Sequence, residues 1–224
     1  MRRGVPFLWM GGVMFILSLA YCLWWYLFPL GHDRPFAGTG ALAWDAVLLT
    51  IFACHHSLFA REPVKTALAP LAGDLLRSIY VWAASLLLLI VCIAWRPVGG
   101  TVFDVSGPVA ALFAIVQVTG VAVIAWSVRQ IDPLELAGIR TGVSQPLQII
   151  GPYRFVRHPL YFGWILAVFG THHLTGDRLA FAVLTSLYLV IAIPWEERSL
   201  VREFGDAYTR YTAEVPWRVI PYVY

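Results

Sequence analysis

Charged residues are scarce in this sequence. Of its 224 residues, 16 are Lys or Arg and 13 are Asp or Glu, so only 13% are charged, about half the share found in soluble domains. In contrast, 59% are apolar, and the mean hydropathy is +0.72. This composition excludes a disordered chain, a collagen and an ordinary water-soluble enzyme, and it leaves a polytopic membrane protein. The formal net charge of +3 is too small to indicate a nucleic-acid partner.

Lysine and cysteine are also rare. Lys65 stands against fifteen arginines, whose planar guanidinium groups pair with carboxylates and phosphates and do not lose their charge. The three cysteines each lie in an apolar stretch, so a disulfide framework is not expected. Without a C-x-x-C pair, no structural zinc site is predicted. The glycine motifs of soluble nucleotide-binding folds, G-x-G-x-x-G and the P-loop, are absent as well.

Long apolar runs fill much of the chain, and a membrane-spanning helix needs about 20 such residues. The first run is too long for a cleaved signal peptide, so we expect it to be retained. The sequence predicts an all-α, polytopic membrane helical bundle of four long spans and a short C-terminal helical hairpin, giving five or six transmembrane helices. The predicted long spans are 5–30, 39–59, 79–95 and 108–128, and the hairpin helices are 160–174 and 179–195.

The arginines predict how the chain is oriented. With the N-terminus in the cytoplasm and every run crossing, thirteen of the Lys and Arg residues fall on the cytoplasmic side and three on the other. This bias obeys the positive-inside rule and predicts that both termini are cytoplasmic. Four full crossings with a re-entrant hairpin would give the same sidedness. We divide the chain into a four-helix membrane region, 1–128, and a cofactor-binding core, 129–224.

The first dense group of polar residues is the sequence GPYRFVRHPLY at 151–161. Pro159 favours the first turn of a helix. His158 would then lie just before that helix, beside free backbone N–H groups that form a ready anion site. The alternative is a set of interfacial residues anchored by Tyr153 and Tyr161, which is common in membrane proteins.

The second group is Glu196 and Glu197, directly after the last apolar run. A carboxylate at a helix C-terminus is opposed by the macrodipole, so a positive group should compensate it. That group is either Arg198 or a cation from outside the helix, unless the helix simply continues as a solvated, charged segment. If the hairpin helices are antiparallel, His158 and Glu196 lie at the same end and form a small-molecule site with apolar walls.

The third group is His55 and His56, near the end of the second predicted span. A histidine inside a membrane suggests function. Adjacent helical residues project about 100° apart, so the pair does not readily ligate one metal ion, and the i,i+4 spacing of a zinc helix is missing. We therefore predict no metal site here. Instead, we expect one of the two imidazole rings to line an internal cavity.

Two motifs in the last 75 residues resemble the integral-membrane methyltransferases. They are GPYRFVRHPLYFGWIL and, about 30 residues later, EERSLVREFGDAYTRYTAEVPWRVIP. This superfamily includes isoprenylcysteine carboxyl methyltransferases, phospholipid methyltransferases and bacterial methanethiol S-methyltransferases. The stretches HSLFAR, RSIYVW and LTGDRLAFA are similar to the methanethiol S-methyltransferase branch and its nitrite-reduction-associated relatives.

The resemblance implies a multi-pass protein of the bacterial inner membrane with its active site facing the cytoplasm. It implies S-adenosylmethionine as cofactor, with S-adenosylhomocysteine as product, in a pocket closed by the C-terminal segment. The residues implied to contact the cofactor are Gln145, Leu147, Gln148, Tyr153, His158, Pro159, Leu160, Tyr161, Glu196 and Glu197.

One departure from the family bears on the methyl acceptor. The isoprenylcysteine enzymes have an Arg about one turn before the Glu pair, and this chain has Ala192 there. This favours a thiol or another lipophilic small acceptor over a carboxylate, in a protein whose other partner is membrane lipid. Candidate catalytic residues are His55, His56 and Arg157, and His158 is a further candidate for deprotonating a thiol. The sequence does not specify the oligomeric state.

Other functions remain open at this point. They are isoprenylcysteine carboxyl O-methylation, phospholipid N-methylation, and a non-enzymatic role for a membrane factor of the same fold. A small transporter is disfavoured because the sequence shows no inverted repeat and no pair of broken helices.

Overall fold

The computed structural model describes residues 5–59, 61–131, 133–140 and 146–224. The chain folds into two compact units. The first consists of Met1–Gly100 and Pro133–Ser144, and the second of Thr101–Asp132 and Gln145–Tyr224. The division predicted from the sequence, into a four-helix membrane region 1–128 and a core 129–224, stays a prediction.

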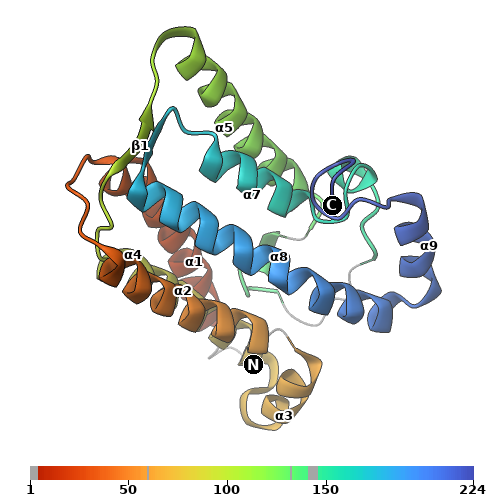
Figure 1. The fold of residues 1–224 in the computed structure, drawn as a ribbon. Coiled ribbons are helices and arrows are strands. Elements are labelled where there is room, and N and C mark those ends of the chain that lie inside the picture. Colours follow the sequence, from red (N-terminus) through yellow and green to blue (C-terminus); the bar gives the residue numbers. More distant parts are fainter. Residues whose placement is uncertain (1–4, 60, 132, 141–145) are drawn as a thin grey trace. The chain divides into compact units, whose positions relative to one another are not determined.

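The first unit is built on three long apolar helices (Figure 1). Its elements are α1 (Val5–Leu27), η2 (Pro29–Gly31), α2 (Thr39–Phe59), α3 (Glu62–Ala72), η3 (Gly73–Leu75), α4 (Leu76–Ala94) and α6 (Pro133–Leu136). Both α1 and α2 pack against α4. Gly11 allows α1 close to α4, because a Cβ atom there would lie 2.8 Å from the indole nitrogen of Trp82.

The C-terminal end of α4 is held by α2. The side chain of Asp45 is fully buried and accepts a hydrogen bond from the backbone N–H of Arg96 at 2.8 Å. The indole of Trp44 donates to the carbonyl oxygen of Ala94 at 2.9 Å, and the Arg96 guanidinium lies 4.2 Å from the Trp44 ring centroid. One of the carbonyl groups left unpaired at the helix end thereby gains a partner.

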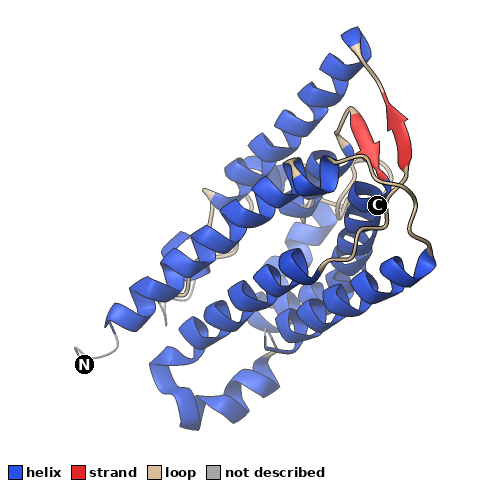
Figure 2. Ribbon diagram, turned by 90° about the vertical axis from the view of Figure 1, so that its left-hand side faces the viewer, coloured by secondary structure: helices blue, strands red, loops and turns tan. Residues whose placement is uncertain are grey.

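The second unit contains α5 and α7, which lie side by side, and the long helix α8 (Figure 1). Its elements are β1 (Thr101–Asp104), α5 (Gly107–Val128), η4 (Gly151–Arg154), α7 (Pro159–Phe169), β2 (His173–Thr175), α8 (Gly176–Phe204) and α9 (Asp206–Glu214). Strands β1 and β2 form an antiparallel two-stranded sheet, in which Phe103 pairs with Leu174 (Figure 2). The Thr175 hydroxyl accepts from the backbone N–H of Arg178 and caps α8.

Five helices are long and apolar enough to cross a membrane: α1 with the turn that follows it, α2, α4, α5 and α8. Outward-facing side chains such as Ile16, Ile115 and Val118 are more than half exposed, as expected where lipid is the solvent. Helix α7 has 11 residues, about half of what a full crossing needs. The predicted all-α membrane bundle is confirmed, with five span-length helices among the described residues.

The predicted hairpin differs in detail from the structure. Its first helix ends at Phe169 rather than at 174, because the chain turns at Gly170 and then enters β2. Its second helix begins at Gly176 and continues through Pro194 to Phe204, nine residues beyond the predicted end at 195. Gly205, with φ of 56°, ends it in a conformation that favours glycine. The two strands and α3 were not predicted.

The contact between α5 and α7 gives a first testable prediction. A Cβ atom on Gly120 would clash with backbone atoms of α7, including the Gly163 carbonyl oxygen at 2.6 Å. Because backbone cannot move aside as a flexible side chain can, we expect Gly120→Ala to destabilise the fold by about 1–3 kcal/mol.

Thermal unfolding of the detergent-purified protein measures this effect. Gly40→Ala is the matched control, because a Cβ atom on Gly40 meets nothing within 4 Å. The control should unfold at the wild-type temperature or slightly above it. Equal thermal unfolding midpoints for Gly120→Ala and Gly40→Ala would contradict the prediction, because they would show that α5 and α7 move apart at little cost.

Candidate active site

Four segments of the second unit meet at the candidate active site. They are the start of α7, the last third of α8, helix α9 and the C-terminal stretch 215–219. Pro159 begins α7, and the carbonyl oxygen of His158 accepts from the backbone N–H groups of Tyr161 and Phe162 at 3.1 and 3.2 Å. His158 is therefore fixed at the position that the sequence predicted, immediately before the helix.

The residues before α7 pair with the C-terminal stretch through the backbone. The N–H of Arg157 donates to the carbonyl oxygen of Trp217 at 2.9 Å, and the N–H of His158 donates to that of Arg218 at 2.7 Å. The Arg157 side chain adds bonds from Nη1 to the carbonyl oxygens of Val215 and Pro216, both at 2.8 Å. Segments about 60 residues apart in the sequence thus form one structural element.

Glu197 is the centre of charge in this cluster. Its Oε1 accepts from Arg157 Nε at 2.6 Å, and its Oε2 accepts from Arg218 Nε at 3.1 Å. His158 Nε2 lies 3.5 Å from Oε1. The side chains of Glu197 and Arg157 are 13% and 8% exposed, so two guanidinium groups hold a largely buried carboxylate.

This arrangement answers the question of how the Glu pair is compensated. The cations come from outside the helix, as one of the alternatives anticipated, and not from Arg198. Helix α8 continues to Phe204, as the other alternative anticipated, so the carboxylates do not lie at a helix C-terminus and the macrodipole does not oppose them there. Desolvation of a carboxylate, rather than its place on a helix, is what requires the two arginines.

Glu196 is the more open of the two carboxylates, with 40% of its side chain exposed. Its Oε1 accepts a hydrogen bond from the Tyr161 hydroxyl, and its Oε2 lies 3.6 Å from His158 Nδ1. The His158 ring stacks on that of Tyr161, with a centroid distance of 5.3 Å. His158 is 8% exposed, and its Nε2 atom is buried without a hydrogen bond of good geometry. The half-exposed Glu196 carboxylate therefore keeps hydrogen-bonding capacity for a ligand, whereas both ring nitrogens of His158 face carboxylates.

An aromatic cluster supports the site from α9. Tyr208, Tyr211 and Val215 are buried together, and Leu147 packs against them. The Tyr211 hydroxyl donates to the carbonyl oxygen of Tyr153 at 2.7 Å and so ties α9 to η4. Burial raises the pKa of the Tyr208 hydroxyl to about 12 and also raises the pKa values of Tyr153 and Tyr211.

These tyrosines predict a loss of stability at alkaline pH. In the unfolded chain tyrosine ionises near pH 10, whereas folded Tyr208 keeps its proton until about pH 12. Between these values the unfolded state binds fewer protons, so the free energy of unfolding falls as pH rises. We expect a fall of about 2 kcal/mol across this range.

Thermal midpoints measured between pH 9 and pH 12 in one detergent test this expectation. Tyr208→Phe should flatten the decline. Tyr222→Phe is the control, because Tyr222 is 85% exposed, and its curve should follow that of the wild type. Identical curves for the wild type and Tyr208→Phe would contradict the prediction.

The structure brings together most of the predicted site residues. Arg157, His158, Tyr161, Glu196 and Glu197 contact one another, and Pro159 is buried at the start of α7, followed by Leu160. Leu147 and Tyr153 belong to the supporting cluster, and the Gln148 amide donates to the carbonyl oxygen of Pro146. Gln145 lies outside the described residues. The cofactor contacts assigned to these residues stay predictions.

His55 and His56 belong to the first unit, where they form an aromatic cluster with α4. The Tyr80 hydroxyl is 2.7 Å from His56 Nδ1, and the His55 ring stacks on Tyr80 at a centroid distance of 5.6 Å. Arg77 lies over the same tyrosine ring, 5.6 Å from its centroid. The catalytic role predicted for the two histidines stays a prediction.

Three residues of the site, Arg218, Tyr208 and Tyr211, were not predicted from the sequence. Arg218 lies in the VPWRVIP ending, which was expected only to close the pocket. Its role becomes visible once the backbone pairing brings it to Glu197. The available signal was the charge itself, because an arginine such as Arg218 in a sequence with so few charged residues is expected to have a specific partner.

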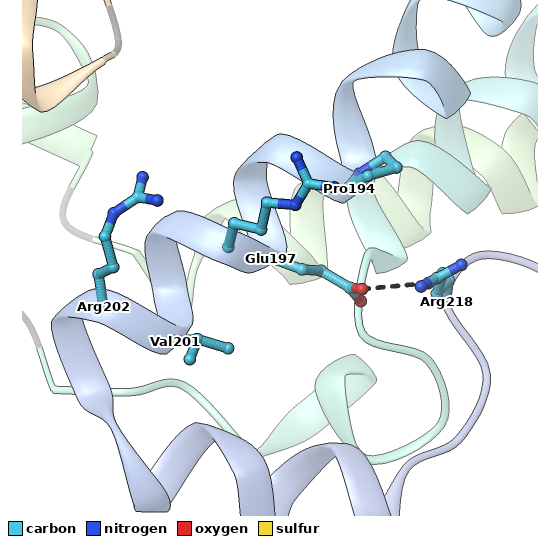
Figure 3. Close-up of a pocket in the computed structure, with 6 residues that line it drawn as sticks. Pro194, Glu197, Val201, Arg202 and Arg218 are labelled. Atoms are coloured by element: carbon cyan, nitrogen blue, oxygen red, sulfur yellow. Dashed lines mark hydrogen bonds and ion pairs between the residues drawn. The ribbon is translucent and has the colours of Figure 1, made fainter.

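A pocket of about 400 Å³ opens beside this cluster. Figure 3 shows Glu197 reaching from α8 towards Arg218, with Val201 and Arg202 further along the same helix. The lining residues are Pro194, Glu197, Arg198, Val201, Arg202 and Arg218.

Comparison with known proteins agrees with the class that the fold and cluster indicate, a membrane methyltransferase. The family described as phospholipid methyltransferase matches residues 108–207. Methanethiol S-methyltransferase 2 of Bradyrhizobium diazoefficiens is 34% identical, over 92% of this chain and 85% of that protein. Methanethiol S-methyltransferase of Mycobacterium tuberculosis is 34% identical over 79% of each chain. Nurim of Sus scrofa is 31% identical, over 71% of this chain and 68% of that protein. No solved structure matches.

The chain belongs to the family of integral-membrane methyltransferases that includes the methanethiol S-methyltransferases. The resemblance predicted from the sequence motifs is confirmed. As a methyltransferase, the protein requires a methyl donor.

Proposed function

We propose that this protein transfers a methyl group from S-adenosylmethionine to a small thiol, at the cytoplasmic face of a bacterial inner membrane. The observation that carries the proposal is the cluster of His158, Tyr161 and Glu196, which lies on the two family motifs and keeps a half-exposed carboxylate. Relatives whose names state methanethiol as the acceptor support the thiol. Ala192, where a carboxylate-methylating relative would have Arg, supports it as well. The cytoplasmic face is supported by the arginine bias.

The residues present fit S-adenosylmethionine. The half-open Glu196 carboxylate suits the hydroxyl and ammonium groups of the cofactor. The aromatic rings of Tyr153 and Tyr161 suit the adenine or the sulfonium. When bound, the cofactor supplies an activated methyl group on a positively charged sulfur. We assign its binding to Glu196 with support from Glu197, and to the start of α7, Tyr153 and the segment 145–148.

The chain's own residues order the site. Tyr161 and His158 fix the Glu196 carboxylate from the first turn of α7. Arg157 and Arg218 neutralise Glu197 and hold the C-terminal stretch in place, which leaves His158 mostly shielded from solvent. Alignment and exclusion of water are the main contributions that a protein makes to a transfer of this kind. We therefore assign Arg157 a positioning role.

The acceptor must lose a proton during the reaction. A free thiol has a pKa of about 8.5, and its thiolate is the better nucleophile. The candidates for accepting this proton are His55, His56 and His158. Methanethiol as acceptor gives dimethyl sulfide, S-adenosylhomocysteine and one proton.

An acceptor panel tests the proposal. Purified protein in lipid vesicles is incubated with methyl-labelled S-adenosylmethionine and methanethiol, a prenylated cysteine or phosphatidylethanolamine. We expect label in volatile dimethyl sulfide and none in the other two products. Label in phosphatidylethanolamine alone would make the protein a phospholipid N-methyltransferase. No label in any product, with no binding of S-adenosylhomocysteine, would contradict the proposal.

A further inference from the structure

Arg198 and Arg202 on the last turns of α8 are available for an external partner. Both side chains are exposed, and they lie one turn apart on the helix. The Arg202 guanidinium donates to the Ser199 hydroxyl at 2.8 Å. Within the part of the chain that the structure describes, neither arginine forms an ion pair with a carboxylate.

The two arginines line the 400 Å³ pocket beside Glu197, and they give it a positive charge. The pocket contains a third guanidinium, that of Arg218, and one carboxylate, that of Glu197. Both oxygens of Glu197 are already paired, Oε1 with Arg157 and Oε2 with Arg218, the pair that Figure 3 shows. The carboxylate is therefore unavailable to neutralise Arg198 or Arg202.

The position of the pocket along α8 indicates which anion it meets. At 1.5 Å per residue, the apolar run of α8, 179–195, is about 26 Å long, close to the ~30 Å thickness of a hydrocarbon core. We place this run across the bilayer, which puts the residues after Trp195 at the membrane surface, at the depth of the lipid phosphates. Pro194 and Val201 are the apolar residues among those that line the pocket.

We propose that this pocket binds the phosphate group of an anionic membrane lipid. Guanidinium groups pair with phosphate oxygens in a fixed planar geometry, and the pocket volume suits a small head group. Inorganic phosphate shares this chemistry, but the location at the end of a spanning helix favours a lipid, since anionic head groups accumulate there. The inference rests on the fold and on the charges of the pocket, and it holds whether or not a thiol is the methyl acceptor.

Binding of short-chain lipids to the detergent-purified full-length protein tests the proposal. Dioctanoyl phosphatidylglycerol is titrated by calorimetry, with dioctanoyl phosphatidylcholine and inorganic phosphate in parallel. We expect phosphatidylglycerol to bind and the other two to bind at least tenfold more weakly. The variant Arg198→Gln/Arg202→Gln should weaken phosphatidylglycerol binding about tenfold or more. Arg210→Gln, which removes an exposed charge on α9 outside the pocket, should not weaken it.

Two further measurements separate this site from the methyl-transfer site and from misfolding. Arg198→Lys/Arg202→Lys keeps the charges but loses the planar guanidinium geometry, so it should bind the lipid more tightly than the glutamine variant and more weakly than the wild type, whereas a folding defect would not depend on charge. S-adenosylhomocysteine should bind the glutamine variant as it binds the wild type. Three results would overturn the proposal: equal binding of phosphatidylcholine, displacement of the lipid by equimolar inorganic phosphate, or a glutamine variant that loses S-adenosylhomocysteine but keeps the lipid.

Discussion

Glu196→Gln is expected to lower kcat/KM for methyl transfer by about 10- to 100-fold while leaving the fold intact. Glutamine keeps the shape of the side chain and an oxygen that accepts from the Tyr161 hydroxyl. It removes the negative charge that we assign to binding the hydroxyl and ammonium groups of the cofactor. Hydrogen bonds to charged groups contribute about 1.5–3 kcal/mol, which corresponds to this factor. Initial rates with methanethiol, and the Kd of S-adenosylhomocysteine by calorimetry, measure the two effects.

The matched control for this variant is Glu203→Gln. Glu203 lies on the same helix, is exposed and is not among the residues that line the pocket. We expect its kcat/KM and its Kd to stay within twofold of the wild-type values, since surface substitutions change little. If Glu196→Gln behaves like this control in both measurements, the cofactor is bound elsewhere.

Arg157→Met is expected to destabilise the second unit by about 3–5 kcal/mol, the usual result of removing one partner of a buried ion pair. Three hydrogen bonds disappear with the guanidinium, one to Glu197 and one each to the carbonyl oxygens of Val215 and Pro216. The C-terminal stretch loses its main side-chain attachment and should become sensitive to protease. Thermal unfolding and mass analysis after limited proteolysis measure both effects.

Two comparisons make this prediction specific. Arg154→Met removes an exposed arginine three residues away and should leave stability and protease resistance unchanged. The double variant Arg157→Met/Glu197→Met should be more stable than Arg157→Met alone, because it leaves no half-paired carboxylate in the protein interior. If Arg157→Met is as stable as the wild type, the backbone hydrogen bonds alone hold the C-terminal stretch in place.

The spanning helices were the most predictable part of the fold. Helix α2 runs from Thr39 to Phe59, as its apolar run predicts, because polar and turn-forming residues border it on both sides. Helix α8 was predicted too short, because an apolar run marks the part of a helix inside the membrane and not the end of its hydrogen bonding. Pro194 removes one backbone donor, and the helix continues past it.

The short strands could not be predicted from local sequence. Strands β1 and β2 have four and three residues, and each is defined by the other across about 70 residues of chain. The candidate site likewise contains residues that local sequence identifies and residues that only tertiary structure identifies. His158, Tyr161 and Glu196 were found because they lie in motifs, whereas Arg218 was missed because its partner, Glu197, is reached only after tertiary pairing of the backbone.

The backbone pairing of Arg157 and His158 with residues 217 and 218 has a consequence for synthesis of the protein. Ribosomes add about 5–20 residues per second, so the partners of these two residues follow them by about 3–12 s. Until residue 218 has been made, Glu197 lacks Arg218, one of its two guanidinium partners. A chain truncated before residue 217 therefore lacks the backbone partners of Arg157 and His158 and the Arg218 guanidinium, and its candidate site is incomplete.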